Sequence, residues 1–388
     1  MSAPLLTLGD LRAWLALGPE GLWEVLQGIS SRALTLDDTF VPAPLDQAVR
    51  DLLARCSDPS KLPLWGVPFV VGANVDVVGM ATSVGIPALD FLPDYDAPLV
   101  EKLCAAGALL VGKTAVDPLC LEHAGDGAVS ALASGVAAFG IVSDRIGTVY
   151  PAAISDGLLA IRSSSEGLAA EGMFGAAPEL DSVVILTSDL ECGAAVRSVI
   201  ENCCDAERSF ESPTSLGVLG SEKSALARNL ADQLCLEVVG IDTTPFAEVA
   251  NLVNDDACLA LRLEDVVAPF FELPELFPQH LHERLSRTLN HSSLDQVRRQ
   301  RRLSGLCRAV ESCFEKVDML FVPHASEFIS FVGACRFAAV TLPSGGILVG
   351  PRGYDDQLAA VVAALTTPTL PMSTQPIDTK PVSPLARQ

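Results

Sequence analysis

Few residues of this chain stand in a pattern that could carry catalysis. Thr148 follows a glycine and bears a hydroxyl that can attack a carbonyl carbon, but only when a neighbouring base takes its proton. Ser163–Ser165 offers further hydroxyls at what reads as the end of a strand, and no base stands near them in the sequence. The G-x-S-x-G turn of many serine hydrolases is absent. The hydroxyl nucleophiles therefore lack an obvious base.

Three carboxylates stand beside these hydroxyls in glycine-rich or strand-end segments. If Asp76, Asp126 and Asp144 come together, they could form an acid–base pair or bind a cation, with Thr148 or Ser130 as the nucleophile. Aspartate is also a common cap and turn residue, and we favour that interpretation. The sequence predicts no metal site.

The segment Gly107–Thr114 matches the phosphate-loop pattern G-x-x-x-x-G-K-[ST]. In a true phosphate loop the strand precedes the first glycine, and the middle residues form an open loop. Here the middle residues, Ala108–Val111, are apolar and read as the strand itself. We therefore expect a strand ending in a tight turn, with Lys113 partly exposed, and no nucleotide-binding loop.

The histidines and cysteines do not form a metal-binding pattern. His280 and His282 are two residues apart in a helical segment, so they point to different faces. His123 and His324 stand alone. The eleven cysteines contain no C-x-x-C pair, which is typical of reduced thiols in a cytoplasmic protein.

The charge of the chain limits its partners. The formal net charge is -22, which disfavours binding to nucleic acid or to an anionic membrane surface. The one basic cluster, Arg298, Arg299, Arg301 and Arg302, is expected to face solvent or to pair with the many carboxylates. No secretory signal or apolar run of about 18 residues is evident, so we expect a cytoplasmic protein that does not cross a membrane.

Helical and strand-like segments alternate along the chain. Residues 5–60 read as a helical region, and the β-branched, apolar run within 62–78 reads as a buried strand. A helix after residue 97, a glycine stop at Gly107 and a strand over 108–112 follow. This alternation predicts an α/β protein with a mixed, mostly buried sheet. We expect one domain over residues 1–365 and a Pro-rich disordered tail over 366–388.

The stretch from Pro63 to Thr114 resembles the amidase-signature family, and more narrowly its allophanate hydrolase branch. Further segments follow in the family's order: TLGDLRAWLALG, PELDSVVILTSDLECGAAV, IDTTPFAEVANLV and ILVGPRGYDDQLAAVVAAL. The resemblance covers about residues 5–365. It implies the amidase-signature fold, a mixed sheet covered by helices on both faces, and suggests a homodimer. It implies no cofactor.

The resemblance also implies that the family's catalytic residues are replaced in this chain. The family uses a neutral Lys as base, a relay Ser and a nucleophilic Ser. Pro68–Asn74 matches the family's P-x-x-V-K-D-N, with Gly72 at the Lys position. Asp126 falls at the relay position and Thr148 at the nucleophile, with Gly147 as the alternative. The matching pocket would be bordered by Asn74, Asp76, Gly127, Ser130, Asp144 and Gly147.

These losses predict a catalytically degenerate amidase-fold protein that serves as a scaffold for binding, assembly or regulation. Its partner would be an unknown protein or a small amide-like ligand. The alternative is an active amidohydrolase on a small urea-derived or amide substrate, with rewired residues that include Thr148. A nucleotide-binding protein that uses Lys113 is the weakest of the three hypotheses.

Overall fold

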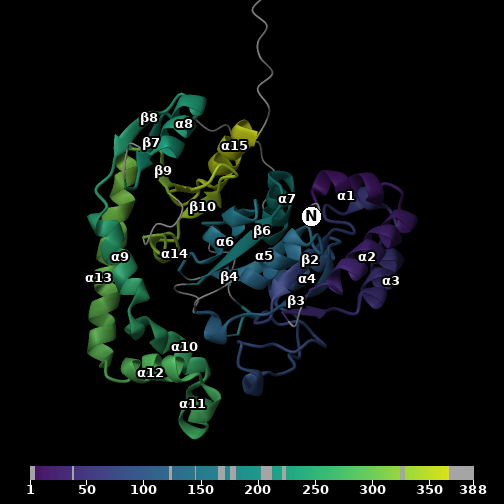
Figure 1. The fold of residues 1–388 in the computed structure, drawn as a ribbon, viewed down its shortest axis with the longest axis horizontal. Coiled ribbons are helices and arrows are strands. Elements are labelled where there is room, and N and C mark those ends of the chain that lie inside the picture. Colours follow the sequence, from purple (N-terminus) through teal and green to yellow (C-terminus); the bar gives the residue numbers. More distant parts are fainter. Residues whose placement is uncertain are drawn as a thin grey trace, which may run out of the picture.

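The computed structural model describes residues 5–36, 39–121, 125–144, 146–164, 171–174, 181–201, 212–220, 224–323 and 328–366. The strands in this part of the chain form one sheet in the order β1-β3-β2-β4-β6-β5-β10-β11-β9-β7-β8 (Figure 1). Their bounds are β1 (Phe40–Pro42), β2 (Pro68–Gly72), β3 (Leu109–Thr114), β4 (Phe139–Asp144), β5 (Leu159–Arg162), β6 (Ser182–Thr187), β7 (Ser215–Val218), β8 (Glu237–Gly240), β9 (Met319–Val322), β10 (Ala338–Thr341) and β11 (Ile347–Gly350).

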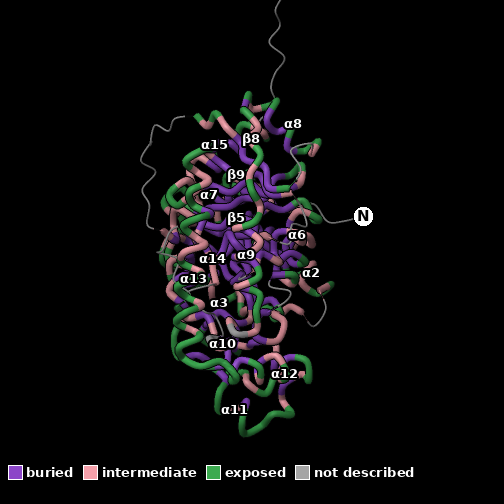
Figure 2. Tube along the Cα trace, turned by 90° about the vertical axis from the view of Figure 1, so that its left-hand side faces the viewer, coloured by how far each residue is buried: buried purple, intermediate pink, exposed green. Residues whose placement is uncertain are grey.

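The sheet is mixed, as the sequence predicted. Strands β3, β2 and β4 run parallel to one another, as do β9, β7 and β8. The strands from β4 through β6, β5, β10 and β11 to β9 pair antiparallel. Figure 2 shows buried residues concentrated at the centre and exposed ones on the outer helices. The predicted α/β fold with a mostly buried mixed sheet is therefore confirmed.

Helices cover both faces of the sheet. The longer helices are α1 (Leu8–Leu15), α2 (Pro19–Ala33), α3 (Leu45–Arg55), α4 (Pro98–Ala105), α5 (Asp126–Ala133), α7 (Leu190–Glu201), α8 (Ala225–Leu234), α9 (Thr244–Asn254), α12 (Gln279–Thr288), α13 (Ser293–Glu311) and α15 (Asp355–Thr366). The shorter ones are α6 (Val149–Ser155), α10 (Ala260–Asp265), α11 (Val267–Glu272) and α14 (Phe331–Ala334).

Two neighbouring residues of β4, Gly140 and Ile141, show which helix covers each face of the sheet. A Cβ added at Gly140 would meet Ala128 and Leu132 of α5, whereas Gly193 of α7 packs against Ile161. Ile161 is in register with Ile141 through β6, and successive side chains of a strand point to opposite faces. Helices α5 and α7 therefore lie on opposite sides of the sheet.

Two short strands escaped the sequence analysis. Strand β1 lies between α2 and α3 at one edge of the sheet, inside the region expected to be helical, and β10 has only small and β-branched residues. Pro42 ends β1, which is tolerated because an edge strand can lack one donor. The α1–α3 region and a group of helices from α9 to α13 flank the sheet at opposite sides of Figure 1.

Strand β3 corrects the expectation for Lys113. The strand runs to Thr114 instead of ending at Gly112, and Lys113 pairs with both β1 and β2. Lys113 is only 1% exposed, not partly exposed as predicted. Its Nζ donates to the Ala81 carbonyl oxygen at 2.7 Å and to Thr82 Oγ1 at 3.3 Å. Burial lowers the pKa of Lys113 to about 8, against the nearby charges of Asp76 and Asp90. No open phosphate loop exists in this segment.

Gly107, the first glycine of the same motif, offers a test of the turn before β3. Its φ is +98°, and an added Cβ would lie 2.8 Å from the Trp65 Cα. Gly79 has a similar φ of +80° but open space around it. We expect Gly107→Ala to lower the free energy of unfolding by about 2–4 kcal/mol, because backbone strain and a collision add.

Gly79→Ala, the matched control, is expected to cost only the backbone strain, about 1 kcal/mol. Urea-induced unfolding measures both variants. Equal losses would mean that the Trp65 backbone moves aside freely.

Candidate active site

The predicted site residues lie near the carboxyl ends of three parallel strands. Gly72 ends β2, Thr114 ends β3 in register with it, and Asp144 ends β4. The first turns of α5 and α6 meet at the same edge, since a Cβ added at Gly125 would lie 2.9 Å from Val149 Cγ2. In open α/β sheets this edge is where ligand sites are usually found. The fold therefore gathers the predicted positions in one region.

The Asn74 side chain occupies the space in front of Gly72. A Cβ added at Gly72 would lie 2.8 Å from Asn74 Oδ1 and 3.5 Å from Val116 Cγ1. Asn74 is fully buried, and its Nδ2 donates to Ser143 Oγ at 3.1 Å and to the Phe174 carbonyl oxygen at 3.3 Å. Its Oδ1 is buried without a hydrogen-bond partner. The carboxamide thus lies where a longer side chain at position 72 would begin.

The residues at the relay position lie at the start of α5. Asp126 is the first residue of the helix and is exposed. Gly127 fits tightly against β3, because its added Cβ would lie 3.0 Å from the Ala115 carbonyl oxygen. Ser130, one turn further, is also exposed. Asp126 and Ser130 therefore face solvent, whereas Asn74 and Asp144 are buried.

Among the predicted residues, Asp144 and Thr148 form the pair that could best act as a base and a nucleophile. Thr148 Oγ1 donates to Asp144 Oδ1 at 3.4 Å, a long hydrogen bond. Asp144 Oδ2 accepts the Gly147 N–H at 2.8 Å. Burial raises the pKa of Asp144 from 3.8 to about 6, although hydrogen bonds from the Gly147 and Val149 amides oppose the shift. The carboxylate is therefore bonded to the amides of Gly147, just before α6, and of Val149, its first residue.

Asp76 belongs to a different polar group. Its Oδ1 accepts from Thr82 Oγ1 at 2.8 Å, and its charge acts on Lys113. Thr82 in turn accepts from Lys113 Nζ. Asp76, Thr82 and Lys113 thus form a buried cluster with its own bonds. The hypothesis of a rewired enzyme would place Asp76 beside Asp144 and Thr148. In the structure, Asp76 instead bonds to Thr82 and acts on Lys113.

Sequence reasoning missed a buried ion pair beside the site. Arg262 Nη2 contacts Asp181 Oδ2 at 2.7 Å, and both side chains are 1% exposed. The charges of both residues act on the buried Cys120 thiol, which hydrogen-bonds Ser143, and the charge of Asp181 also acts on Asp144. The Nε and Nη1 atoms of Arg262 are buried and have no hydrogen-bond partner. A pair 81 residues apart leaves no local signal in a single sequence.

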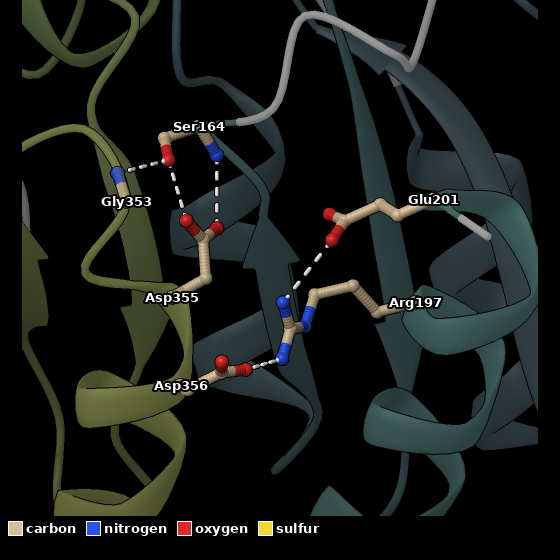
Figure 3. Close-up of polar contacts among 6 residues, drawn as sticks. All are labelled: Ser164, Arg197, Glu201, Gly353, Asp355 and Asp356. Atoms are coloured by element: carbon tan, nitrogen blue, oxygen red, sulfur yellow. Dashed lines mark hydrogen bonds and ion pairs between the residues drawn. The ribbon is translucent and has the colours of Figure 1, made fainter. Parts of the chain in front are cut away.

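A second hydroxyl–carboxylate pair joins β5 to α15 (Figure 3). Ser164 Oγ donates to Asp355 Oδ2 at 2.5 Å and accepts the Gly353 N–H at 2.8 Å. Nearby, Arg197 bridges Glu201 and Asp356. Sequence reasoning found no base near this serine because Asp355 lies 191 residues away. The adjoining cavity, about 20 Å³, holds no more than a water molecule, so we interpret the cluster as a structural clamp.

No cation site emerges from the part of the chain that the structure describes, where no group of three or more His, Cys, Asp and Glu residues could hold a metal ion. His280 and His282 lie on α12, and His282 stacks on Phe270. His123, His324, Ser165 and the tail beyond residue 366 lie outside the described residues. None of the described helices is long and apolar enough to span a bilayer.

The fold is that of solved amidase structures. The sequence profile of the Amidase family matches residues 36–126. The chain is 25% identical to the urea amidolyase of Saccharomyces cerevisiae over 352 residues, 73% of this chain and 19% of that protein. It is 30% identical to a glutamyl-tRNA(Gln) amidotransferase subunit of Methanosarcina barkeri over 161 residues, 36% of this chain and 34% of that protein.

Solved structures agree with these matches. A Kluyveromyces lactis allophanate hydrolase variant superimposes with a TM-score of 0.78 at 19% identity, covering 94% of this chain and 73% of that one. The chain is therefore a homologue of amidase-signature proteins and has their fold. It spans less than a fifth of the urea amidolyase and about a third of the amidotransferase protein.

The crowding at Gly72 predicts energetic coupling with Asn74. We expect Gly72→Ala to lower the free energy of unfolding by about 1–2 kcal/mol, because the new methyl group displaces the Asn74 carboxamide. In an Asn74→Ala background the same change should cost about 1 kcal/mol less, since Oδ1 is gone. A double-mutant cycle by chemical denaturation measures the coupling. Strict additivity would contradict the proposed collision.

The buried Asp144 predicts a pH dependence of stability. A pKa raised from 3.8 to about 6 means that the folded protein binds this proton more tightly than the unfolded chain. The free energy of unfolding should therefore fall as pH rises from about 4 to 6, by on the order of 3 kcal/mol. The non-titrating Asp144→Asn variant should lack this component. Unfolding curves of the two proteins that run parallel across this range would refute the assignment.

Proposed function

We propose that this protein is a catalytically degenerate member of the amidase-signature fold that acts as a binding, assembly or regulatory scaffold. The relation to allophanate hydrolase is seen in the fold and in the sequence matches. The proposal rests chiefly on Gly72, which supplies no base, and on Asn74, whose carboxamide occupies the space that a base would enter. Without a base, the Thr148 hydroxyl is a weak nucleophile.

The surroundings of Arg262 support binding of a small amide-like ligand. Its unpartnered Nε and Nη1 atoms lie beside the candidate site, and buried donors without partners carry a free-energy cost that a bound acceptor would remove. A carbonyl or carboxylate oxygen is the matching acceptor. A protein partner or a second copy of the chain, as the homodimer hypothesis holds, could equally use the retained scaffold.

A second candidate is an amidohydrolase in which Asp144 activates Thr148. The observation in its favour is the 3.4 Å contact between their oxygens, together with the Asp144 pKa of about 6. Against it stand the two main-chain amides that hold the same carboxylate. In this case kcat/KM would rise with pH around 6, as the base loses its proton.

Ammonia release from allophanate and simple amides separates the two candidates. We expect the purified protein to release no more ammonia than the Thr148→Ala variant does. The combined change Gly72→Lys, Asp126→Ser and Thr148→Ser should give little or no activity, because Asn74 blocks the new lysine. Turnover that disappears in Thr148→Ala would overturn the proposal and favour the rewired enzyme.

A further inference from the structure

A second cavity lies away from the candidate active site, along α13, the long helix at the left of Figure 1. Its volume is about 740 Å³, within the range of small-molecule sites. We call it the arginine pocket. The residues that line it are Cys258, Ala260, Gln296, Arg299, Gln300, Leu303, Ser304, Cys307, Arg308, Glu311, Ala334, Arg336 and Arg352. It shares no residue with the site at Gly72 and Thr148.

One face of α13 forms the wall of the pocket. Gln296, Gln300, Ser304 and Arg308 recur every four residues, and so do Arg299, Leu303, Cys307 and Glu311. Residues four apart are neighbours on a helix surface. The two rows thus present a strip of polar side chains, all of them donors except the Glu311 carboxylate, that is interrupted by Leu303 and Cys307. The opposite wall comes from α14, Arg336 and Arg352.

The charge of the pocket opposes that of the chain. Four arginines and one glutamate line it, although the whole chain carries a net charge of -22. Arg299 is neutralised by Asp255 at 3.2 Å. Arg308 and Arg352 form no ion pair with a carboxylate of the described chain. Arg352 Nε instead donates to the Cys335 carbonyl oxygen at 3.3 Å.

Arg308 and Arg352 differ from the arginines of the basic cluster on α13. The basic cluster was expected to face solvent or pair with carboxylates, and Arg298, Arg299 and Arg302 do contact Asp295, Asp255 and Glu248. Arg301 is exposed and does not line the pocket. In a chain with a large excess of carboxylates, guanidinium groups left unneutralised around a cavity are available to an external anion.

We propose that the arginine pocket binds a small organic anion with more than one phosphate or carboxylate group. The guanidinium fork matches the paired oxygens of either group and binds them through two parallel hydrogen bonds. Gln300 and Ser304 would supply neutral hydrogen bonds to the rest of the ligand. The cavity suits a small molecule, and the net charge of the chain disfavours nucleic acid.

A cysteine in the pocket wall gives a local reporter. Cys307 is half-buried, and its Sγ lies 3.6 Å from the Ala334 carbonyl oxygen. A hydrogen bond from Cys335 lowers the pKa of the Cys307 thiol, and the charge of Arg352 acts in the same direction. The thiolate is the form that reacts with alkylating agents. A ligand in the pocket should therefore slow alkylation at this residue.

Calorimetric titration with tripolyphosphate and with citrate, in about 150 mM salt to screen diffuse attraction, tests the proposal. We expect saturable one-to-one binding of at least one anion, and the identity of that anion distinguishes phosphate from carboxylate recognition. The double variant Arg308→Gln/Arg352→Gln should bind about tenfold more weakly or worse. The matched control Arg301→Gln, on the same helix, should bind like the original protein.

N-ethylmaleimide labelling of Cys307, followed by peptide mass spectrometry, supplies the second readout. The bound anion should slow labelling at Cys307 and leave labelling at the exposed Cys235 unchanged. Both substituted arginines are exposed, so the thermal unfolding midpoint should stay close to that of the original protein. Absence of saturable binding to either anion would overturn the proposal. So would an equal loss of affinity in Arg301→Gln, which would indicate diffuse attraction.

Discussion

Burial of the sheet on both faces is the constraint from which the rest of the structure follows. Phe69, Val70 and Val71 of β2 are fully buried, as are Phe139 and Ile141 of the neighbouring β4. A polar side chain within such a layer must find a partner or carry a desolvation penalty. Lys113 illustrates this penalty, since burial holds its pKa well below the usual value even with two acceptors at hand. Polar side chains are therefore found mainly at the ends of the strands.

At those strand ends, most polar groups bond to one another or to the main chain. Asn74 joins the end of β2 to Ser143 of β4, and Asp144 accepts from the amides of Gly147 and Val149 at the entry to α6. A catalytic group needs lone pairs or protons that are not already committed. The exceptions include Asn74 Oδ1, the Tyr150 hydroxyl and two nitrogens of Arg262, which are buried without partners. Under the proposed loss of the base, these unsatisfied groups suit recognition of a ligand better than its conversion.

The fold could be predicted from the sequence because it depends on local hydrophobic patterns and on family-like segments that follow a fixed order along the chain. The apolar run within 62–78 contains strand β2, and the glycine stop at Gly107 lies between α4 and β3. Strands β1 and β10 were missed because short strands carry little periodicity. The exposure of Lys113 was predicted wrongly, since only the pairing of β3 with strands on both sides reveals its burial.

The site was less accessible to sequence reasoning. The matches to the family's pattern at Gly72, Asp126 and Thr148, and the single domain over residues 1–365, stay predictions. The Arg262–Asp181 pair and the Ser164–Asp355 contact each join segments far apart in the chain. No propensity or spacing rule connects such residues, because their proximity is a product of the completed fold.

The edge of the sheet at Gly72 and the arginine pocket differ in how strongly substitutions there would affect the stability of the fold. The edge of the sheet at Gly72 is part of the core, so changes there are coupled to stability through Asn74 and Asp144. The arginine pocket lies on a peripheral helix, and its unneutralised arginines are exposed. Surface substitutions away from packing cost little stability, so a binding site can be adjusted there without disturbing the sheet. Under the proposed loss of the base, the core would serve as a rigid support and recognition would lie at the periphery.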